Sequence, residues 1–135
     1  MLVTQEACPA CQGSLEILAG QAIQASGVGW FRSYRCKTCD FRVEEDGNEP
    51  DPSLREELLN RQGTWLLQIH FLKDRLAALL IVGQRLKISA RDLIQPEVTD
   101  RRRVAAGTHL EMEWLRRCLL EKAITAEVVR SPTNQ

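Results

Sequence analysis

Cys8-Pro9-Ala10-Cys11 is one of two short motifs that decide the fold of this chain; the other is Cys36-Lys37-Thr38-Cys39. Each motif places two cysteines three positions apart, and 24 residues separate the motifs. A Cys-x2-Cys turn can bend two sulfur atoms toward one point, and two such turns complete a tetrahedral set of four ligands. Four thiolates leave no coordination position for water or substrate, so an ion held there is structural. We therefore predict a structural Zn²⁺ site at Cys8, Cys11, Cys36 and Cys39.

Three other uses of the four cysteines deserve comparison with zinc. The first residues contain no basic segment followed by an apolar one, and no apolar run reaches the ~18 residues that span a bilayer. We therefore expect a cytoplasmic protein, in which thiols stay reduced and paired disulfides are disfavoured. A rubredoxin-like iron site also uses paired Cys-x2-Cys motifs, and a single such motif serves redox chemistry. Two pairs at this spacing favour one shared zinc ion over either alternative.

The two motifs, together with Gly13, resemble those of zinc ribbons, which are small β-hairpin domains. The resemblance implies a domain over residues 1–43 that binds nucleic acid or protein, or only braces a fold. A domain of this size has too little core to fold without a staple, and a metal supplies one. We expect strands over residues 14–19, 30–35 and 40–43, with a loop opening at Gly20 and a turn at residues 27–29.

Charge divides the chain into two halves. The 135 residues carry no net charge, but residues 1–52 hold eight acidic and four basic side chains, whereas residues 53–135 hold ten and fourteen. A neutral chain lacks the dominant positive field of a protein that coats nucleic acid. Residues 44–52 are acidic and contain two prolines, which predicts a linker between two domains.

The second domain, residues 53–135, is predicted to be a compact β-α-α-β-α-β module with a leading helix. Ser53 and Glu56 form one predicted capping box, and Thr108 and Glu111 form another. Alternation of apolar residues over 64–71 favours a strand there, although one or two long helices over 53–87 remain the alternative. The expected elements are a helix from Ser53 to Gly63, a strand at 64–71, a helix from Asp74, a short helix from Ser89 to Pro96, a strand at 103–106, a helix to about Lys122 and a strand at 125–130. The chain is thus expected to have an α+β fold, a zinc-ribbon hairpin domain followed by this module.

Residues 65–130 resemble the C-terminal domain of the bacterial ribosomal stalk protein. The matching segments are Arg75–Ala78, Leu86–Ile94, Val104–Gly107, Glu113–Leu119 and Ala126–Val129. The family docks translational GTPases through basic residues on its first helix, and Arg75 and Arg91 are the basic positions that carry over. Here the first helix contains Leu79-Leu80-Ile81-Val82 in place of the family's lysines. The glycines that flank the family's turn before the second helix are also absent. The adaptor of the Clp protease has a similar architecture, so substrate delivery is a second implication.

No catalytic constellation is visible in the sequence, so we do not expect an enzyme. His70 and His109 are isolated, and Cys118 lies on an apolar helical stripe with Leu110, Trp114, Leu115 and Leu119, typical of a core residue. The dense basic cluster, Arg101, Arg102 and Arg103, can contact RNA phosphate, an acidic partner or solvent.

The sequence favours a zinc-containing protein-interaction module whose partner is a protein, with the ribosome or a translation factor implied by the stalk-like resemblance. The leucine-rich helix after Asp74 is the first candidate for the contact surface. The alternative is a nucleic-acid-binding regulator in which Trp30, Phe31 and Tyr34 stack on bases. The acidic balance of residues 1–52 weighs against that alternative.

Overall fold

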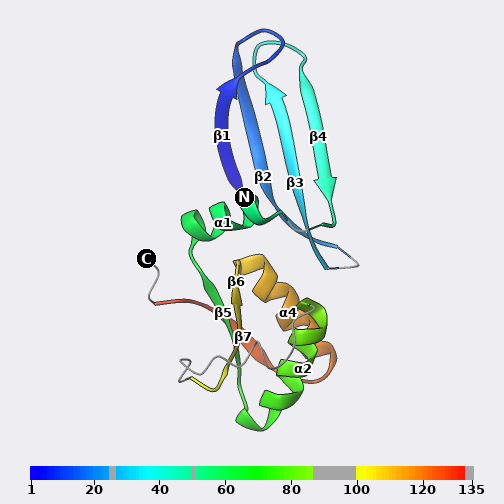
Figure 1. The fold of residues 1–135 in the computed structure, drawn as a ribbon, viewed down its shortest axis with the longest axis vertical. Coiled ribbons are helices and arrows are strands. Elements are labelled where there is room, and N and C mark those ends of the chain that lie inside the picture. The colour runs from blue at the N-terminus through cyan, green and yellow to red at the C-terminus, as the bar shows by residue number, and fades with distance from the viewer. Residues whose placement is uncertain (25–26, 50, 87–99, 133–135) are drawn as a thin grey trace. The chain divides into compact units, whose positions relative to one another are not determined.

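A computed structural model describes residues 1–24, 27–49, 51–86 and 100–132 of the chain. The chain forms two compact units, Met1–Leu58 and Leu59–Gln135. The first unit is built around a β-sheet, and the second combines a sheet with helices (Figure 1). The expected α+β fold class is therefore confirmed.

The first unit contains a four-stranded antiparallel sheet whose strand order follows the sequence. Its strands are β1 (Leu2–Ala7), β2 (Ser14–Gln24), β3 (Gly27–Cys36) and β4 (Arg42–Gly47). Because the strands alternate in direction, the β1–β2 and β3–β4 loops lie at the same end of the sheet (Figure 1). Those two loops carry the cysteine motifs, so the strand topology alone brings both motifs to the same end of the sheet.

Three sequence expectations for this unit need correction. Gly20 does not open a loop, because β2 continues to Gln24, and residues 27–29 belong to β3 rather than to a turn. A Cβ atom on Gly20 would lie 3.0 Å from the ring of Phe31, so this glycine makes room for an aromatic side chain on the neighbouring strand. The acidic residues 44–47, expected in the linker, form most of β4 and pair with β3. The strand β1 was not foreseen.

One face of this sheet carries two small apolar clusters. Leu15 and Ile17 pack with Cys8 and Cys36 beside the cysteine loops, with Tyr34 and Phe41 partly buried against them. At the opposite end, buried residues from β1, β2 and the helix α1 (Pro52–Gln62) form the other cluster, and Trp30 packs against it. Its buried members are Leu2, Ala19, Leu54 and Leu58. The aromatic side chains Trp30 and Tyr34 therefore contribute to the packing of these clusters.

Asp51 caps α1, which corrects the expected capping box at Ser53. The Asp51 carboxylate accepts a hydrogen bond of 3.1 Å from the backbone N–H of Leu54, and Pro52 occupies the first helical position. The same carboxylate forms an ion pair of 2.7 Å with Arg32 of β3. The Leu54 N–H and the Arg32 guanidinium together hold the pKa of Asp51 below its ordinary value. One acidic side chain thus connects the start of α1 to the sheet.

The second unit has a three-stranded antiparallel sheet in the order β6-β5-β7. Its described elements are β5 (Trp65–Ile69), η1 (Leu72–Asp74), α2 (Arg75–Leu86), β6 (Arg103–Gly107), α4 (His109–Glu121) and β7 (Ala126–Arg130). The strand β5 excludes the alternative of long helices over residues 53–87, and Gly63, with φ of 87°, ends α1 as expected. The expected short helix from Ser89 to Pro96 lies outside the described residues.

Among the described residues of the second unit, the core is a cluster of eleven buried side chains. Leu67 and Ile69 of β5 meet Leu79 and Val82 of α2 and Leu115 of α4 in this cluster. The apolar stripe expected on α4 is largely present, since Leu115, Cys118 and Leu119 are buried. Met112 is also buried there, whereas Leu110 is only half-buried.

Both ends of α4 are held by backbone and side-chain hydrogen bonds. The capping box expected at its start is confirmed, because Thr108 accepts from the Glu111 N–H and Glu111 accepts from the Thr108 N–H. At its end, the N–H groups of Ala123 and Ile124 donate to the carbonyls of Leu120 and Leu119. This is a Schellman arrangement, and Ala123 occupies its left-handed position with φ of 61°.

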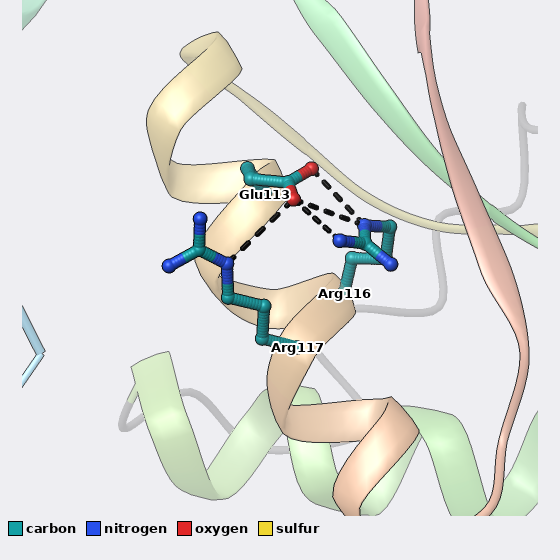
Figure 2. A network of polar contacts seen from close by, with 3 residues as sticks. All are labelled: Glu113, Arg116 and Arg117. Carbon is teal, nitrogen blue, oxygen red and sulfur yellow. Dashed lines mark hydrogen bonds and ion pairs between the residues drawn. The ribbon is translucent and has the colours of Figure 1, made fainter.

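Figure 2 shows an ion-pair network on α4, in which Glu113 lies between two arginines. Arg116 donates to both carboxylate oxygens of Glu113, and Arg117 approaches one of them at 3.7 Å. The hydrogen bonds from Arg116, followed by its charge and that of Arg117, hold the pKa of Glu113 below its ordinary value. The three side chains, one helical turn apart, stabilise α4.

Candidate metal centre

Four sulfur atoms converge at the end of the first sheet where the β1–β2 and β3–β4 loops lie. The Sγ atoms of Cys8, Cys11, Cys36 and Cys39 all lie within 4.8 Å of one another. Cys8 and Cys39 are separated by 3.8 Å between their sulfur atoms, and Cys11 and Cys36 by 3.5 Å. A tetrahedral site with metal–sulfur bonds of about 2.3 Å places its sulfur atoms about 3.8 Å apart. The four thiols therefore form a group that can hold one metal ion.

Backbone N–H groups point at the sulfur atoms in both loops. In the first loop, Ala10 N–H donates to Cys8 Sγ at 3.4 Å and Gly13 N–H donates to Cys11 Sγ at 3.3 Å. In the second loop, Cys36 Sγ accepts from Thr38 and Cys39, at 3.3 and 3.4 Å, and Cys39 Sγ accepts from Phe41 at 3.5 Å. Such donors fix the orientation of the sulfur ligands and favour their negatively charged form.

The backbone of each loop is closed by its own hydrogen bonds. In the first loop, Gln12 N–H donates to Cys8 O and Cys8 N–H donates to Gly13 O, both at 2.8 Å. Gln12 adopts φ of 63°, the left-handed conformation that lets the chain reverse so tightly. In the second loop, Cys36 N–H donates to Phe41 O at 3.0 Å. Each turn is therefore preformed by the local backbone.

Gly13 and Thr38 bring the two loops against each other. A Cβ atom on Gly13 would lie only 2.0 Å from the Thr38 hydroxyl oxygen, so a larger residue fits only if the Thr38 side chain moves. The Thr38 hydroxyl in turn lies 3.4 Å from Cys36 Sγ and 3.9 Å from Cys11 Sγ. This close approach across the site explains why a glycine follows Cys11 by two residues.

The thiols differ in their affinity for protons. Hydrogen bonds from the Thr38 hydroxyl and from the N–H groups of Thr38 and Cys39 lower the pKa of Cys36 to about 6. The Phe41 N–H favours the Cys39 thiolate, but hydrogen bonds with the neighbouring thiols and loss of hydration outweigh it and raise the pKa of Cys39 to about 12. Four negative sulfur atoms this close together repel one another, so a proton or a cation must lie among them.

The ligand set is closed and chemically uniform. Cys8 and Cys36 are buried, whereas Cys11 is exposed and Cys39 is intermediate. All four donors are sulfur, which suits soft ions that accept tetrahedral thiolate coordination. With four protein ligands around one ion, no position remains for an activated water molecule. An ion bound by these four sulfur atoms would link the two loops, and this structural role is what the site can provide.

The remaining predicted contact residues lie in the second unit. Arg75 Nε donates to the Arg101 carbonyl at 2.9 Å, which brings the start of α2 to the turn before β6. Arg101 and Arg102 are exposed, and Arg103 is half-buried at the start of β6. Arg91 lies outside the described residues. The structure therefore brings Arg75 to the arginine cluster, which sequence spacing did not foresee.

Three residues that the sequence leaves isolated, Cys118, His109 and His70, lie at positions where packing or exposure accounts for them without a ligand. Cys118 is buried on α4, and burial raises its thiol pKa, as befits a small core residue. His109 is exposed and contacts the Trp65 ring edge-on at 4.6 Å between centroids. His70 is exposed beyond the end of β5.

A hollow of about 220 Å³ lies on the sheet of the first unit, between the cysteine loops and α1. Arg32 and Tyr34 line it, together with apolar side chains such as Ile17 and Leu54. Arg32 already pairs with Asp51. Burial and a hydrogen bond with Glu45 raise the pKa of Tyr34, so its hydroxyl also has a partner. The hollow is therefore a gap between two small clusters rather than a prepared ligand site.

Comparisons of the chain with protein-family models, with curated proteins and with solved structures found no significant match. Among the described residues, no helix is long and apolar enough to cross a bilayer.

Proposed function

We propose that this chain is a non-enzymatic, cytoplasmic protein-interaction module whose first unit is made rigid by a structural zinc ion. The observation that carries the proposal is the convergence of four Sγ atoms within 4.8 Å from two loops at one end of a sheet. Zinc is favoured because it accepts four thiolates tetrahedrally and has no redox chemistry of its own. A rubredoxin-like iron site uses the same ligands and is the principal competitor.

The chemistry of this site supports a non-catalytic role for the ion. Four protein sulfurs saturate the ion, so the ion activates neither water nor a substrate carbonyl. The backbone N–H groups around the site donate to the sulfur atoms and so orient the ligands. The module therefore acts by recognition, and the metal keeps its shape.

Protein is the favoured partner because the second unit exposes several large apolar side chains, which a binding surface uses and a solvated surface avoids. The stalk-like resemblance of residues 65–130 supports a ribosomal or translation-associated partner. A nucleic-acid-binding role is the second candidate, and the contact between Arg75 and the arginine cluster favours it. The packing of Trp30 and Tyr34 against apolar clusters weighs against base stacking by these two residues.

Metal content is tested first, by native mass spectrometry and elemental analysis of the purified chain. We expect one zinc per chain, lost in Cys36→Ser and retained in the matched variant Cys118→Ala. If the purified chain contains one iron ion and shows thiolate-to-iron charge-transfer bands, the proposed structural ion is iron and not zinc. A metal-free chain that still melts cooperatively in both units would contradict it.

Partner class is tested next, by affinity capture from the protein's own cell extract and by sedimentation with ribosomes. We expect specific protein capture at 150 mM salt and no retention on random RNA or DNA at low salt. If ribosomes are the partner through the arginine cluster, replacing Arg101, Arg102 and Arg103 by alanine abolishes co-sedimentation. Salt-dependent binding to random nucleic acid would favour the second candidate instead.

A further inference from the structure

We propose that the start of α2 and the turn before β6 form a docking surface for an acidic amphipathic helix of a partner protein. This inference rests on the proposed function and names the chemistry of the partner. The surface has two parts. The apolar stripe is Leu72, Leu76 and Leu80, together with Phe71; the basic rim is Lys73, Arg75, Arg101 and Arg102.

The apolar stripe is unusually exposed for side chains of its kind. The exposed fraction is 57% for Phe71, 50% for Leu72, 68% for Leu76 and 51% for Leu80. The adjoining side of the same helix, which includes Leu79 and Val82, is packed in the core. The three leucines are spaced by four residues, so they follow one another along one side of η1 and α2. They offer an apolar ridge about 12 Å long.

The basic rim borders this stripe. Arg75 precedes Leu76 at the start of α2, and its Nε atom donates to the Arg101 carbonyl. Lys73 Nζ lies 5.7 Å from the centre of the Phe71 ring, so its charge sits over the aromatic end of the stripe.

Among the described residues, basic side chains outnumber acidic ones at the rim. The Asp100 oxygens accept from Arg102 N–H and Gln68 Nε2. Residues 71–76 and 100–103 hold five basic and two acidic side chains, the other carboxylate being Asp74. The rim is therefore positive.

The chemistry of the stripe selects a protein helix as its occupant. Three of the four side chains in the stripe are leucines, which gain free energy by meeting other apolar side chains and have no π face for a base; Lys73 Nζ lies over the ring of the fourth, Phe71. A ridge of residues spaced by four packs into the groove of another helix. The positive rim adds a requirement for carboxylates beside the apolar anchors of that helix.

The same charge argues against a second copy of this chain as the occupant. In a symmetric dimer through this surface, each basic rim would face the identical rim of its partner or lie beside it. Like charges brought together in this way oppose association. An acidic helix pairs with the rim instead.

The test is a selection of random helical peptides, displayed on phage, against the immobilised full-length, metal-loaded chain. We expect the enriched sequences to be net acidic, with apolar residues spaced by three or four. One enriched peptide is then synthesised, and its affinity is measured by fluorescence anisotropy. We expect the double variant Leu76→Gln/Leu80→Gln to weaken binding by about tenfold or more, and Arg101→Glu/Arg102→Glu to weaken it and to reduce its dependence on salt.

The matched control is Leu120→Gln, because Leu120 is 52% exposed on α4 and lies outside the surface. It leaves the affinity unchanged, and circular dichroism verifies that all variants remain folded. Neutral or basic selected sequences, or unchanged affinity of the double variant, would overturn the inference. So would preferential binding of a 20-nucleotide RNA, or a dimer of the free chain that the double variant abolishes.

Failure of this inference is distinguishable from failure of the proposed function. If the chain contains zinc and captures the same partner with and without Leu76→Gln/Leu80→Gln, the proposed function stands and this surface is not the contact. If the chain contains no zinc, the proposed function fails, while the peptide selection still reports on the surface.

Discussion

The two units of the chain obtain their stability in different ways. Counted over the part of the chain that the structure describes, the first unit has two clusters of four buried residues each, and two of those eight residues are Cys8 and Cys36. The second unit has one cluster of eleven buried residues, to which both described helices and the sheet contribute. Ordering a residue costs about 1–2 kcal/mol of backbone entropy, so buried area must offset that cost. The comparison supports the proposal that an ion bound by the four cysteines compensates for the small core of the first unit.

Metal removal is the strongest way to break this comparison. We expect a chelator, or Cys36→Ser, to unfold β1–β4 while β5, β6 and α4 stay folded, because a structural zinc site contributes about 10–16 kcal/mol of binding free energy to the fold. Hydrogen exchange resolved along the chain measures both units in one experiment. Cys118→Ala serves as the control that changes a cysteine without touching the four ligands. Equal protection of both units after chelation would refute the contrast.

A core truncation should produce the opposite pattern. Leu115 is completely buried in the second unit, so we expect Leu115→Ala to destabilise that unit by about 2–5 kcal/mol. The metal content should remain one ion per chain, and the protection of β2 and β3 should be unchanged. Urea unfolding followed by NMR signals of each unit gives both quantities. Leu120→Ala, at an exposed site of the same helix, should stay within about 0.5 kcal/mol of the parent.

Gly13→Ala sharpens the comparison within the first unit. The added Cβ would meet the Thr38 hydroxyl oxygen at 2.0 Å and displace the side chain that donates to Cys36 Sγ. We expect metal affinity to fall by about 10–100-fold, which a competition titration with a chromophoric chelator measures. Thr38→Ala in the same chain should restore part of the affinity. Gly20→Ala, whose Cβ meets the Phe31 ring far from the site, is the matched glycine control.

A pH series separates the electrostatics of the second unit from the metal of the first. The pKa of Glu113 is lowered in the folded chain, so its contribution to the free energy of unfolding is full above the ordinary value of 4.5 and is lost as the pH falls through the lowered value. We expect Glu113→Gln to destabilise the second unit by about 0.5–1 kcal/mol at pH 7. The difference from the parent should vanish well below pH 4.5 in urea unfolding of that unit. If the difference in free energy of unfolding were as large at low pH as at pH 7, Glu113 would stabilise the unit through packing and not through charge. Glu121→Gln on the same helix is the control.

Local spacing predicted the cysteine cluster and most of the second unit. Two Cys-x2-Cys motifs specify a short turn by themselves, and the capping box at Thr108 and Glu111 needs only four consecutive residues. The expected ranges failed where a distant residue decides the outcome. Gly20 stays in a strand because Phe31 lies across from it, and Asp51 caps α1 while pairing with Arg32 of β3.

Burial was the least predictable property from sequence. Leu76 and Leu79 have the same side chain on the same helix, yet one is exposed and the other is buried. The two residues are three positions apart, so the helical period places them next to each other, and only the packing of the helix in the core decides which one is covered. The contact of Arg75 with Arg101 likewise depends on the return of the chain to β5. Pairing of this kind is nonlocal, and a single sequence does not encode it in its spacing.

The alignment of β2 with β3 has a consequence for how the chain matures. Ten residue pairs align these strands, with Leu15 opposite Cys36 and Gln24 opposite Gly27. A shift of one position would turn the Cys36 side chain to the other side of the sheet and take its sulfur away from Cys11. An ion that requires four sulfurs would therefore be retained only by correctly aligned hairpins, and misaligned chains would emerge from synthesis without it. On the proposed function, metal capture would thus select chains whose hairpin is correctly paired.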